Sequence, residues 1–239
     1  MAPRSKSRKG YSYHSISDSF QLGINRVPRK KFNSHIDYIS SKTDAFLSFD
    51  DGYESFYTNA LDSIIKADIT ATVFPVTGSI GSYNNWDVNF FINRERHMDR
   101  QQLADAYSRG VKIGSHGHRH RSFLYMSTSE LVNELKVSKE ILEDIVSEEI
   151  DSLSPPFGHL DLRVLNEAYK AGYRKIFLNN EISIPKDLEN LEIIQTMPIT
   201  RLDSVSALKR KFSGSFYERA KGNFISSFSN LSVIVKEIL

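Results

Sequence analysis

Short apolar runs alternate along the chain with longer stretches in which apolar residues recur at helical spacing. The strand-like runs are 11–15, 45–49, 70–76, 111–115, 150–153, 175–178 and 192–196. The helical stretches are 32–41, 54–67, 99–110, 127–146 and 162–171, with a further helix predicted from 205 onward. We therefore predict an α/β fold with parallel strands, because strand, helix and strand in succession are typical of parallel sheets.

Capping signals support two of the predicted helix boundaries. Asp99 is placed to cap the helix that Gly110 ends. Ser127 and Glu130 are three residues apart, which is the spacing of a capping box. We expect the long helix to begin there.

Candidate chemistry follows two of the strand-like runs. Asp50 and Asp51 end one run, and His116 and His120, with His118 between them, follow another. Imidazole nitrogen and carboxylate oxygen are ligands that Zn²⁺, Co²⁺ and Ni²⁺ favour. His116 and His120 are four residues apart and can point the same way from a helical turn or tight loop, whereas His118 would point elsewhere. We predict that this pair binds a divalent metal with one of the two carboxylates, while the other carboxylate meets the bound water.

Each cluster also has a simpler interpretation. The sequence Asp-Asp-Gly at 50–52 is typical of a turn. The histidines at 116–120, next to Arg119 and Arg121, could form a solvated loop. Both clusters follow predicted strands, and active sites of α/β folds gather at the carboxyl ends of strands, which favours the metal site.

Three motifs follow one another in the chain. They are Ser48-Phe49-Asp50-Asp51-Gly52, the tract from Ser115 and His116 to His120, and Ser154-Pro155-Pro156-Phe157-Gly158 before the helix at 162–171. In this order they resemble the motifs of polysaccharide deacetylases of the NodB-homology type, carbohydrate esterase family 4. The resemblance runs from about residue 13 to about residue 180. It implies a distorted (β/α) barrel of about seven parallel strands, which composition alone could not choose.

The resemblance also implies a reaction and roles for five residues. Asp50 would be the catalytic base, and Asp51, His116 and His120 would bind the metal. The backbone N–H of Phe157 would contribute to the oxyanion site. The metal would acidify its water and polarise the amide carbonyl, and the base would take the proton of the water. The implied activity is metal-dependent removal of N-acetyl groups from an N-acetylated sugar or polysaccharide, with Zn²⁺ as the first choice of metal and Co²⁺ or Ni²⁺ as alternatives.

The chain departs from the family pattern at three functional positions. The downstream aspartate-tryptophan motif is not visible, since the only tryptophan, Trp86, lies before the histidines. Ser154 stands where the family has an arginine that orients the base, and a serine can form a hydrogen bond but carries no charge. Arg201 is a candidate for that missing charge, or a solvated arginine. The late leucine-histidine motif that supplies the general acid is missing, because the last histidine is His159. We consider His159 and His14 as candidates for the acid, although each could instead only pack or cap a loop.

The stretch between 78 and 97 is long for a connection and contains several aromatic residues, among them Trp86. Long loops over a barrel mouth often bind substrate, and aromatic faces suit sugar rings. We therefore expect Trp86 to contact substrate, together with Pro156 of the third motif. Alternatively, the aromatic residues of this stretch pack the loop against the barrel.

Composition and charge narrow the class of protein. The chain has 239 residues, 40% of them hydrophobic, and no cysteine, so we expect a large core without disulfides or thiolate metal ligands. We predict a basic, disordered arm at 1–10 and a single domain at 11–239. A net charge of +2 gives no reason to expect a nucleic-acid partner. No apolar run suits a signal peptide or a membrane span, and we expect a cytoplasmic protein.

Two other functions stay open at this point. The same site could hydrolyse a non-sugar amide or an O-acetyl ester. The chain could also be a catalytically silent relative that binds metal or carbohydrate, which the missing arginine, tryptophan motif and late histidine favour. Asp50 argues against a pure binder, since metal binding alone has no need of a second carboxylate.

Overall fold

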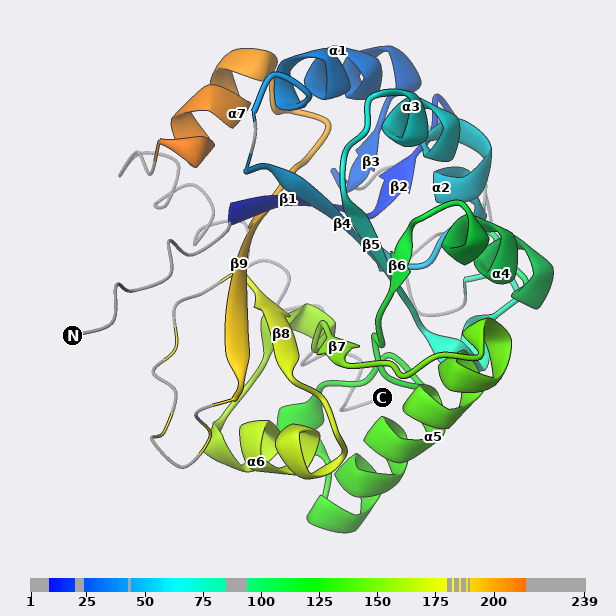
Figure 1. Cartoon of the computed structure of the whole chain (residues 1–239), viewed down its shortest axis with the longest axis vertical. Coiled ribbons are helices and arrows are strands. Elements are labelled where there is room, and N and C mark those ends of the chain that lie inside the picture. Colours follow the sequence, from blue (N-terminus) through cyan, green and yellow to red (C-terminus); the bar gives the residue numbers. More distant parts are fainter. Residues whose placement is uncertain are drawn as a thin grey trace.

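Seven parallel strands form the central sheet, in the order β6-β5-β4-β1-β9-β8-β7 (Figure 1). The computed structural model describes residues 9–213 except 20–23, 43, 85–93, 180–181, 183–184, 186–187 and 189. The strands are β1 Lys9–Tyr13, β4 Phe46–Asp51, β5 Ala71–Pro75, β6 Lys112–Ile113, β7 Ser152–Leu153, β8 Lys175–Leu178 and β9 Glu192–Pro198. An isolated parallel bridge joins Ser115, just after β6, to Leu153 of β7. The two edges of the sheet therefore meet, and the predicted (β/α) barrel is confirmed.

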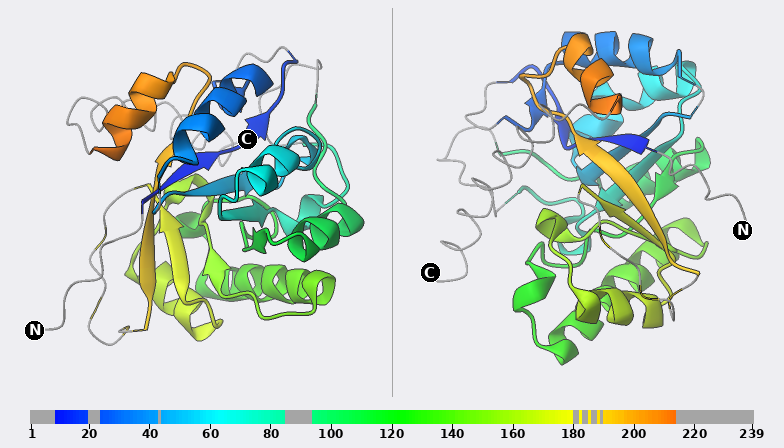
Figure 2. Two further views of the ribbon diagram at one scale, coloured as in Figure 1. Left: turned by 45° about the horizontal axis from the view of Figure 1, so that its top comes forward. Right: turned by 90° about the vertical axis from the view of Figure 1, so that its left-hand side faces the viewer.

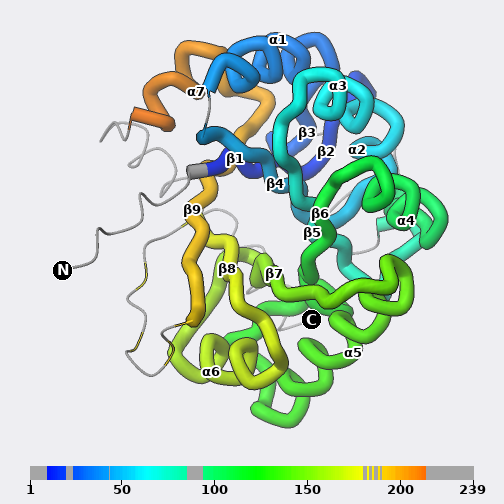
Figure 3. Tube along the Cα trace, in the orientation of Figure 1, coloured from blue at the N-terminus to red at the C-terminus, as the bar shows by residue number. Residues whose placement is uncertain are grey.

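Helices surround the outside of the barrel (Figures 1 and 2). They are α1 Arg29–Ile39, α2 Glu54–Asn59, α3 Leu61–Lys66, α4 Arg100–Ser108, α5 Thr128–Val146, α6 Leu162–Lys170 and α7 Val205–Phe212. Helix α7 packs beside α1, so late and early parts of the described chain meet (Figure 3). Within the described part of the chain, no helix has the length and apolar character that crossing a membrane requires.

Short elements lie between the main strands and helices. A two-stranded parallel pair consists of β2 Ser15–Ile16 and β3 Arg26–Val27. The 3₁₀ turns are η1 Thr77–Ser79, η2 Phe123–Tyr125 and η3 Pro156–Gly158. The pair β2–β3 was not predicted, because two-residue strands are too short to show an alternating pattern.

Two further differences from the sequence prediction concern element boundaries. The helix predicted at 54–67 is divided at Ala60, where φ is −119°, into α2 and α3. Strand β1 begins at Lys9, so the end of the predicted N-terminal arm belongs to the sheet. The rest of that arm and residues 214–239 lie outside the described residues.

Both predicted capping sites are confirmed. The Asp99 side chain accepts the N–H of Gln102 at 2.9 Å, and the Gln102 side chain accepts the N–H of Asp99 at 3.0 Å. Ser127 and Glu130 form the same reciprocal arrangement at the start of α5. These bonds satisfy helix N–H groups that have no partner within the helix, and so they fix where α4 and α5 begin.

The interior of the barrel is filled by aromatic side chains. The rings of Phe74 and Phe177 lie 4.7 Å apart although β5 and β8 are not neighbours in the sheet. The ring of Phe46 contacts Phe177 at 5.9 Å. Gly10 and Gly114 leave room for these rings, since an added Cβ would lie 2.1 Å from Phe46 and 2.4 Å from Phe74. The barrel is therefore a packed core rather than a channel.

Side chains along β4 alternate between the inside and the outside of the barrel. Phe49 faces outward, where its ring contacts Phe32 of α1 at 6.1 Å. Phe46, Ser48 and Asp50 share the inward face, because the side-chain period of a strand is two. This inward row changes from aromatic to acidic along the strand, which places Asp50 at the carboxyl end of the barrel.

Candidate metal centre and active site

The predicted site residues lie where β4, β6 and β7 end. Asp50 and Asp51 are the last residues of β4, His116 follows β6, and Ser154 follows β7. Strand β5 lies between the first two motifs: its Pro75 pairs with Asp51, and its carbonyl accepts the N–H of His116 at 3.1 Å. The sheet thus brings together residues that are far apart in the sequence.

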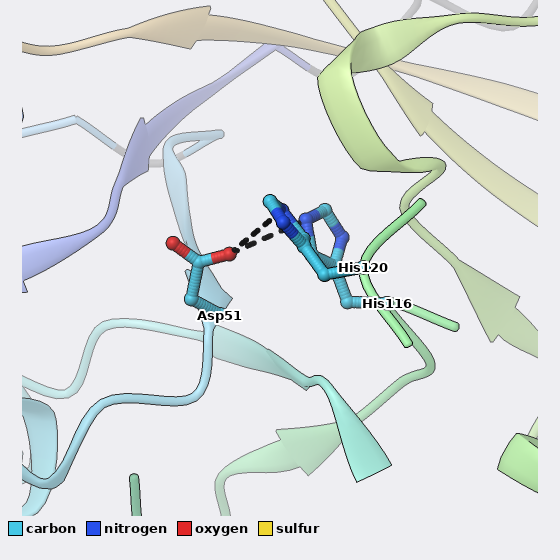
Figure 4. Close-up of side chains that lie close together, drawn as sticks. All are labelled: Asp51, His116 and His120. Carbon is cyan, nitrogen blue, oxygen red and sulfur yellow. Dashed lines mark ion pairs between the residues drawn. The ribbon is translucent and has the colours of Figure 1, made fainter. Parts of the chain in front are cut away.

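Asp51, His116 and His120 form the candidate metal site (Figure 4). Oδ1 of Asp51 lies 3.3 Å from Nε2 of His120 and 3.6 Å from Nε2 of His116. The three potential ligand atoms all lie within 4.8 Å of one another, and all three residues are buried. Figure 4 shows both imidazoles directed at the same carboxylate oxygen. The structure therefore brings together the three residues that the sequence predicts as ligands.

A hydrogen bond fixes which nitrogen of His116 faces this site. Nδ1 donates to the carbonyl of Ser154 at 2.6 Å, since a carbonyl can only accept. The neutral ring then has its lone pair on Nε2, facing Oδ1 of Asp51. Oδ1 is buried and has no hydrogen-bond partner among the described residues. Two atoms with lone pairs that face one another in a buried site repel each other unless a cation lies between them. Imidazole nitrogens and a carboxylate oxygen are ligands that suit Zn²⁺, Co²⁺ or Ni²⁺.

Asp51 keeps its charge in this buried position. Burial raises the pKa of its carboxyl group, but the neighbouring histidines, His120 first and His14 second, together lower it by more. The net result is a pKa below the ordinary value of 3.8. The carboxylate form, which is the metal ligand, therefore prevails at neutral pH.

A tight turn directs the two histidines toward one point. Gly117 has a φ of 78° and His120 a φ of 51°, both in the left-handed region. Buried Glu134 of α5 accepts the backbone N–H of His118 at 2.7 Å and thereby holds the turn. The His118 ring is hydrogen-bonded through Nδ1 to Oγ1 of Thr77 at 2.9 Å. His118 lies outside the metal cluster, as its place between the two ligands predicts.

Asp50 has surroundings different from those of Asp51. It is half-buried, and each of its carboxylate oxygens accepts a hydrogen bond from a serine hydroxyl. Ser12 donates to Oδ2 at 2.9 Å, and Ser154 donates to Oδ1 at 3.0 Å. Arg201, the candidate for the missing charge, is exposed in the turn after β9. Within the described residues, two neutral hydroxyls donate to the carboxylate of Asp50, and the role of Arg201 stays a prediction.

The third motif lies against the candidate metal site. Phe157 has a left-handed backbone with φ of 63°, and its ring centroid is 4.8 Å from that of His120. Pro156 is buried directly before it. A left-handed residue other than glycine costs on the order of 1 kcal/mol, so the surrounding loop has to hold Phe157 in place. The oxyanion role of its N–H stays a prediction.

The two candidates for the general acid are both near the site. His159 has Nδ1 3.0 Å from Oγ of Ser122, and its ring lies 5.9 Å from that of Phe157. His14 directly follows β1, the neighbour of β4, and contributes to lowering the pKa of Asp51. Both stay candidates for the acid. Trp86, the predicted sugar contact, lies outside the described residues.

Two residues of the site were not predicted as such. His97 is buried, its Nδ1 donates to the backbone carbonyl of Asp51 at 2.9 Å, and its ring packs on Tyr53 at 4.8 Å. It follows a long connection and belongs to no motif, so nothing in the sequence indicates its place. Ser12 was missed as well, and its signal is a lone small polar residue in a strand of buried aromatics.

The chain matches one protein-family model. The family is described as "Polysaccharide deacetylase", and the match covers residues 38–176. This range includes Asp50, Asp51, His116, His120 and Phe157. The motifs that carry the resemblance in the sequence therefore all lie inside the matched region.

Named relatives and a solved structure agree with this match. The peptidoglycan-N-acetylmuramic acid deacetylase PdaA of Bacillus subtilis is 29% identical over 175 residues, which cover 68% of this chain and 60% of PdaA. The poly-beta-1,6-N-acetyl-D-glucosamine N-deacetylase of Staphylococcus epidermidis is 26% identical over 161 residues, covering 64% of this chain and 53% of that protein. The chain spans about three fifths of the length of the first curated relatives it matches. The deacetylase PplD of Streptococcus pyogenes superposes with a TM-score of 0.69 over 84% of this chain and 96% of its own at 17% identity, which shows a common fold.

Proposed function

The chain belongs to the polysaccharide deacetylase family, and from this we propose that it is a metal-dependent hydrolase that removes N-acetyl groups from an N-acetylated sugar or polysaccharide. One observation carries the proposal. Asp51 stands in a buried cluster with His116 and His120, while the adjacent Asp50 is half-buried and outside that cluster. Metal-assisted hydrolysis needs one carboxylate that binds the metal and a second carboxylate beside it that can accept a proton.

A divalent metal held by Asp51, His116 and His120, with Zn²⁺ first and Co²⁺ or Ni²⁺ as alternatives, would polarise the acetyl carbonyl and acidify a water molecule. The protein prepares these residues in advance. The pKa of Asp51 lies below its ordinary value, so its carboxyl group is ionised at neutral pH. His116 is held in the required tautomer by the carbonyl of Ser154.

Asp50 acts as the general base in this proposal. Each of its oxygens accepts one serine hydroxyl and retains a second lone pair, which can take the proton of the attacking water. The water oxygen forms a bond to the carbonyl carbon of the amide. The carbonyl oxygen then carries the negative charge. The backbone N–H of Phe157 is proposed to donate a hydrogen bond to that oxygen, since the third motif lies against His120.

The departing amine needs a proton when the carbon–nitrogen bond breaks. His14 and His159 are the candidates, because both lie near the site and both can donate from a ring nitrogen. The products are a free amine on the sugar and acetate. Thus the hydrolysis consumes one water and balances without a further reactant.

The substrate class rests on the relatives. PdaA and the Staphylococcus epidermidis enzyme are named for N-acetylated sugar polymers, and we propose a substrate of that class for this chain. Trp86 and Pro156 stay the predicted sugar contacts. The related alternatives are an O-acetyl ester or a non-sugar amide as substrate, and a silent protein that binds metal or carbohydrate.

Acetate release by the purified protein tests the proposal. The panel contains N-acetylglucosamine oligomers, O-acetylated sugars and small non-sugar amides, each with added Zn²⁺. Release from the oligomers supports the proposed function. Release only from esters or other amides would replace the substrate class, and stoichiometric metal binding without any release would replace the enzyme by a binding protein.

A further inference from the structure

We propose that Ser12 and Ser154 are paired positioning residues that fix the carboxylate of Asp50. This inference rests on the proposed function, in which Asp50 is the base. The two serines come from separate parts of the fold, since Ser12 lies in β1 and Ser154 follows β7. They reach Asp50 from positions 38 and 104 residues away in the sequence.

The two contacts constrain the carboxylate in complementary ways. Ser12 donates to Oδ2 at 2.9 Å and Ser154 donates to Oδ1 at 3.0 Å. A single donor would leave the carboxylate able to turn about that one bond. With a donor on each oxygen, the plane of the group is fixed, and its remaining lone pairs keep one direction. A general base is efficient only when its accepting oxygen is held within a fraction of an ångström of the position from which it can take the proton.

Burial makes these contacts hard to replace by water. Ser12 is 1% exposed and Ser154 is 7% exposed. Hydrogen bonds from a hydroxyl to a charged carboxylate are shorter and stronger than neutral ones. Among the described residues, the side-chain hydrogen bonds to Asp50 come from these two hydroxyls, so hydroxyl dipoles stand where the family has a charged group.

Ser154 also connects the base to the candidate metal site. Its carbonyl accepts Nδ1–H of His116 at 2.6 Å, and its own N–H donates to the carbonyl of Ser115 at 2.9 Å. Only the hydroxyl contacts Asp50, and both other contacts belong to the backbone. A substitution to alanine therefore removes the contact with the base and leaves the contact with His116.

The register of the sheet explains how β1 supplies its serine. Ser12 pairs with Ser48 of β4, and Asp50 lies two residues beyond Ser48 on the same face. The inward face of β1 carries Gly10 and then Ser12, both small. A larger residue at position 12 would occupy the space into which the Asp50 carboxylate extends.

The test compares Ser12→Ala, Ser154→Ala, the double variant and Ser152→Ala as control. Ser152 is also 7% exposed and also donates to a carboxylate, that of Asp151, at 2.7 Å. We expect kcat for acetate release to fall about 10- to 100-fold in each single variant, because a hydrogen bond to a charged group is lost. KM, metal affinity and melting temperature of Ser12→Ala and Ser154→Ala should stay close to those of the wild type. The Ser152→Ala control should keep wild-type kcat.

The double variant and Ser154→Thr distinguish paired action from separate roles. If the two hydroxyls act as a unit, the double variant is at most about threefold slower than the slower single variant, and Ser154→Thr, which keeps a hydroxyl, retains most of the rate. Single variants with wild-type kcat, a rate loss that follows lost metal, or losses that multiply in the double variant would each overturn the proposal.

A crystal structure of the double variant separates this inference from the proposed function. We expect the Asp50 carboxylate to leave its wild-type orientation or to occupy two orientations, whether or not any substrate is turned over. An unchanged carboxylate overturns the inference. An inactive wild-type protein removes the proposed function, whereas an active wild type with fully active serine variants removes only the positioning role.

Discussion

Adjacent carboxylates at the end of β4 have opposite environments. Asp51 has a φ of 68° and is followed by Gly52 with a φ of 70°, so the chain turns sharply at the second carboxylate. Asp51 is buried among imidazoles, whereas Asp50 is half-buried between two hydroxyls. This division lets one carboxylate bind a cation while its neighbour stays available for a proton.

Replacing Asp50 by asparagine should remove turnover and spare the metal site. An amide cannot take the proton of the attacking water, so we expect acetate release to fall about 10²- to 10⁴-fold. Metal stoichiometry, measured by atomic absorption on the same sample, should equal that of wild type. Full activity of Asp50→Asn would show that the base is another residue.

Replacing His116 by alanine should remove metal and turnover together. His118→Ala is the matched control, because His118 lies two residues away and its ring bonds to Thr77 instead of facing Asp51. We expect at least a tenfold loss of Zn²⁺ affinity for His116→Ala and less than a twofold change for the control. The measurement is competition with a chromophoric chelator. Equal metal affinity in both variants contradicts the ligand assignment.

The sequence predicts some site residues far better than others. Asp51, His116 and His120 belong to motifs after strands, and the structure brings them together. His97 reaches the site only through tertiary packing, and the lone serine between the tyrosines of β1 does not by itself show that Ser12 contacts Asp50. The motif position of Ser154, by contrast, already indicates a partner of Asp50, and in the structure its hydroxyl donates to Oδ1.

Helix α5 controls the shape of the histidine turn. Glu134 has a fully buried side chain, and its Oε1 accepts the backbone N–H groups of His118 and Arg119 at 2.7 and 2.5 Å. Its Oε2 accepts Nε of Arg119 at 2.9 Å. A Cβ on Gly117 would lie 3.3 Å from the same carboxylate. The capping box at Ser127 fixes the start of α5 and thereby the position of this contact.

Glu134→Gln should weaken metal binding without touching a ligand. The amide keeps the volume of the side chain but loses the charge that holds two N–H groups and the guanidinium. We expect Zn²⁺ affinity to fall roughly tenfold, the low end of the effect of residues that orient ligands. Glu140→Gln on the same helix is the control, because Glu140 is exposed and its ion pair is with Lys136 of the same helix. If both variants bind Zn²⁺ as wild type does, α5 does not set the geometry of the turn.

Most elements follow from local patterns in the sequence. The alternation of apolar runs and amphipathic stretches predicts the seven strands of the barrel and their helices, because the strands are buried on both faces and each helix buries one. The break at Ala60 and the pair β2–β3 have no such pattern. The closure of the sheet into a barrel also depends on the whole chain, and only the family resemblance indicated it.

At the scale of the whole molecule, a buried polar chain connects the sheet to α1 and α7. The hydroxyl of Tyr13 donates to Nδ1 of His35 at 3.1 Å, and Nε2 of His35 donates to the carbonyl of Asp203 at 3.2 Å. The Asp203 carboxylate contacts Lys211 of α7 at 3.0 Å. Both ring nitrogens of His35 are thus engaged in its neutral form.

This arrangement predicts loss of stability in mild acid. Burial lowers the pKa of His35 from 6.5 to about 4, and the charges of Lys31 and Lys211 also lower it against the opposing effect of Asp203. Between these values the unfolded chain binds the proton more readily, so stability falls as pH falls from 6.5 to about 4, by up to about 1.4 kcal/mol per pH unit. Urea unfolding of wild type and His35→Gln across this range should show the weaker pH dependence in the variant. Equal slopes would mean that His35 does not titrate in this way.

The residues that stabilise the barrel and the residues of the candidate active site lie in different parts of it. Its interior is filled by Phe46, Phe74 and Phe177, and the polar residues gather at the carboxyl ends of the strands. The family match at 38–176 includes the carboxyl ends of β4, β5, β6 and β7. Consequently, substitutions of the site residues should change activity with little effect on the fold.

Metal-dependent acetate release from N-acetylglucosamine oligomers is the most direct test of this account. The protein is stripped with a chelator, assayed, and assayed again after one equivalent of Zn²⁺ is restored. We predict no release from the stripped protein and recovery of release on restoration in wild type, with no recovery in Asp50→Asn. Release that is unaffected by the chelator, or equal recovery in both proteins, would contradict the assignment of Asp51, His116 and His120 to the metal and Asp50 to the proton.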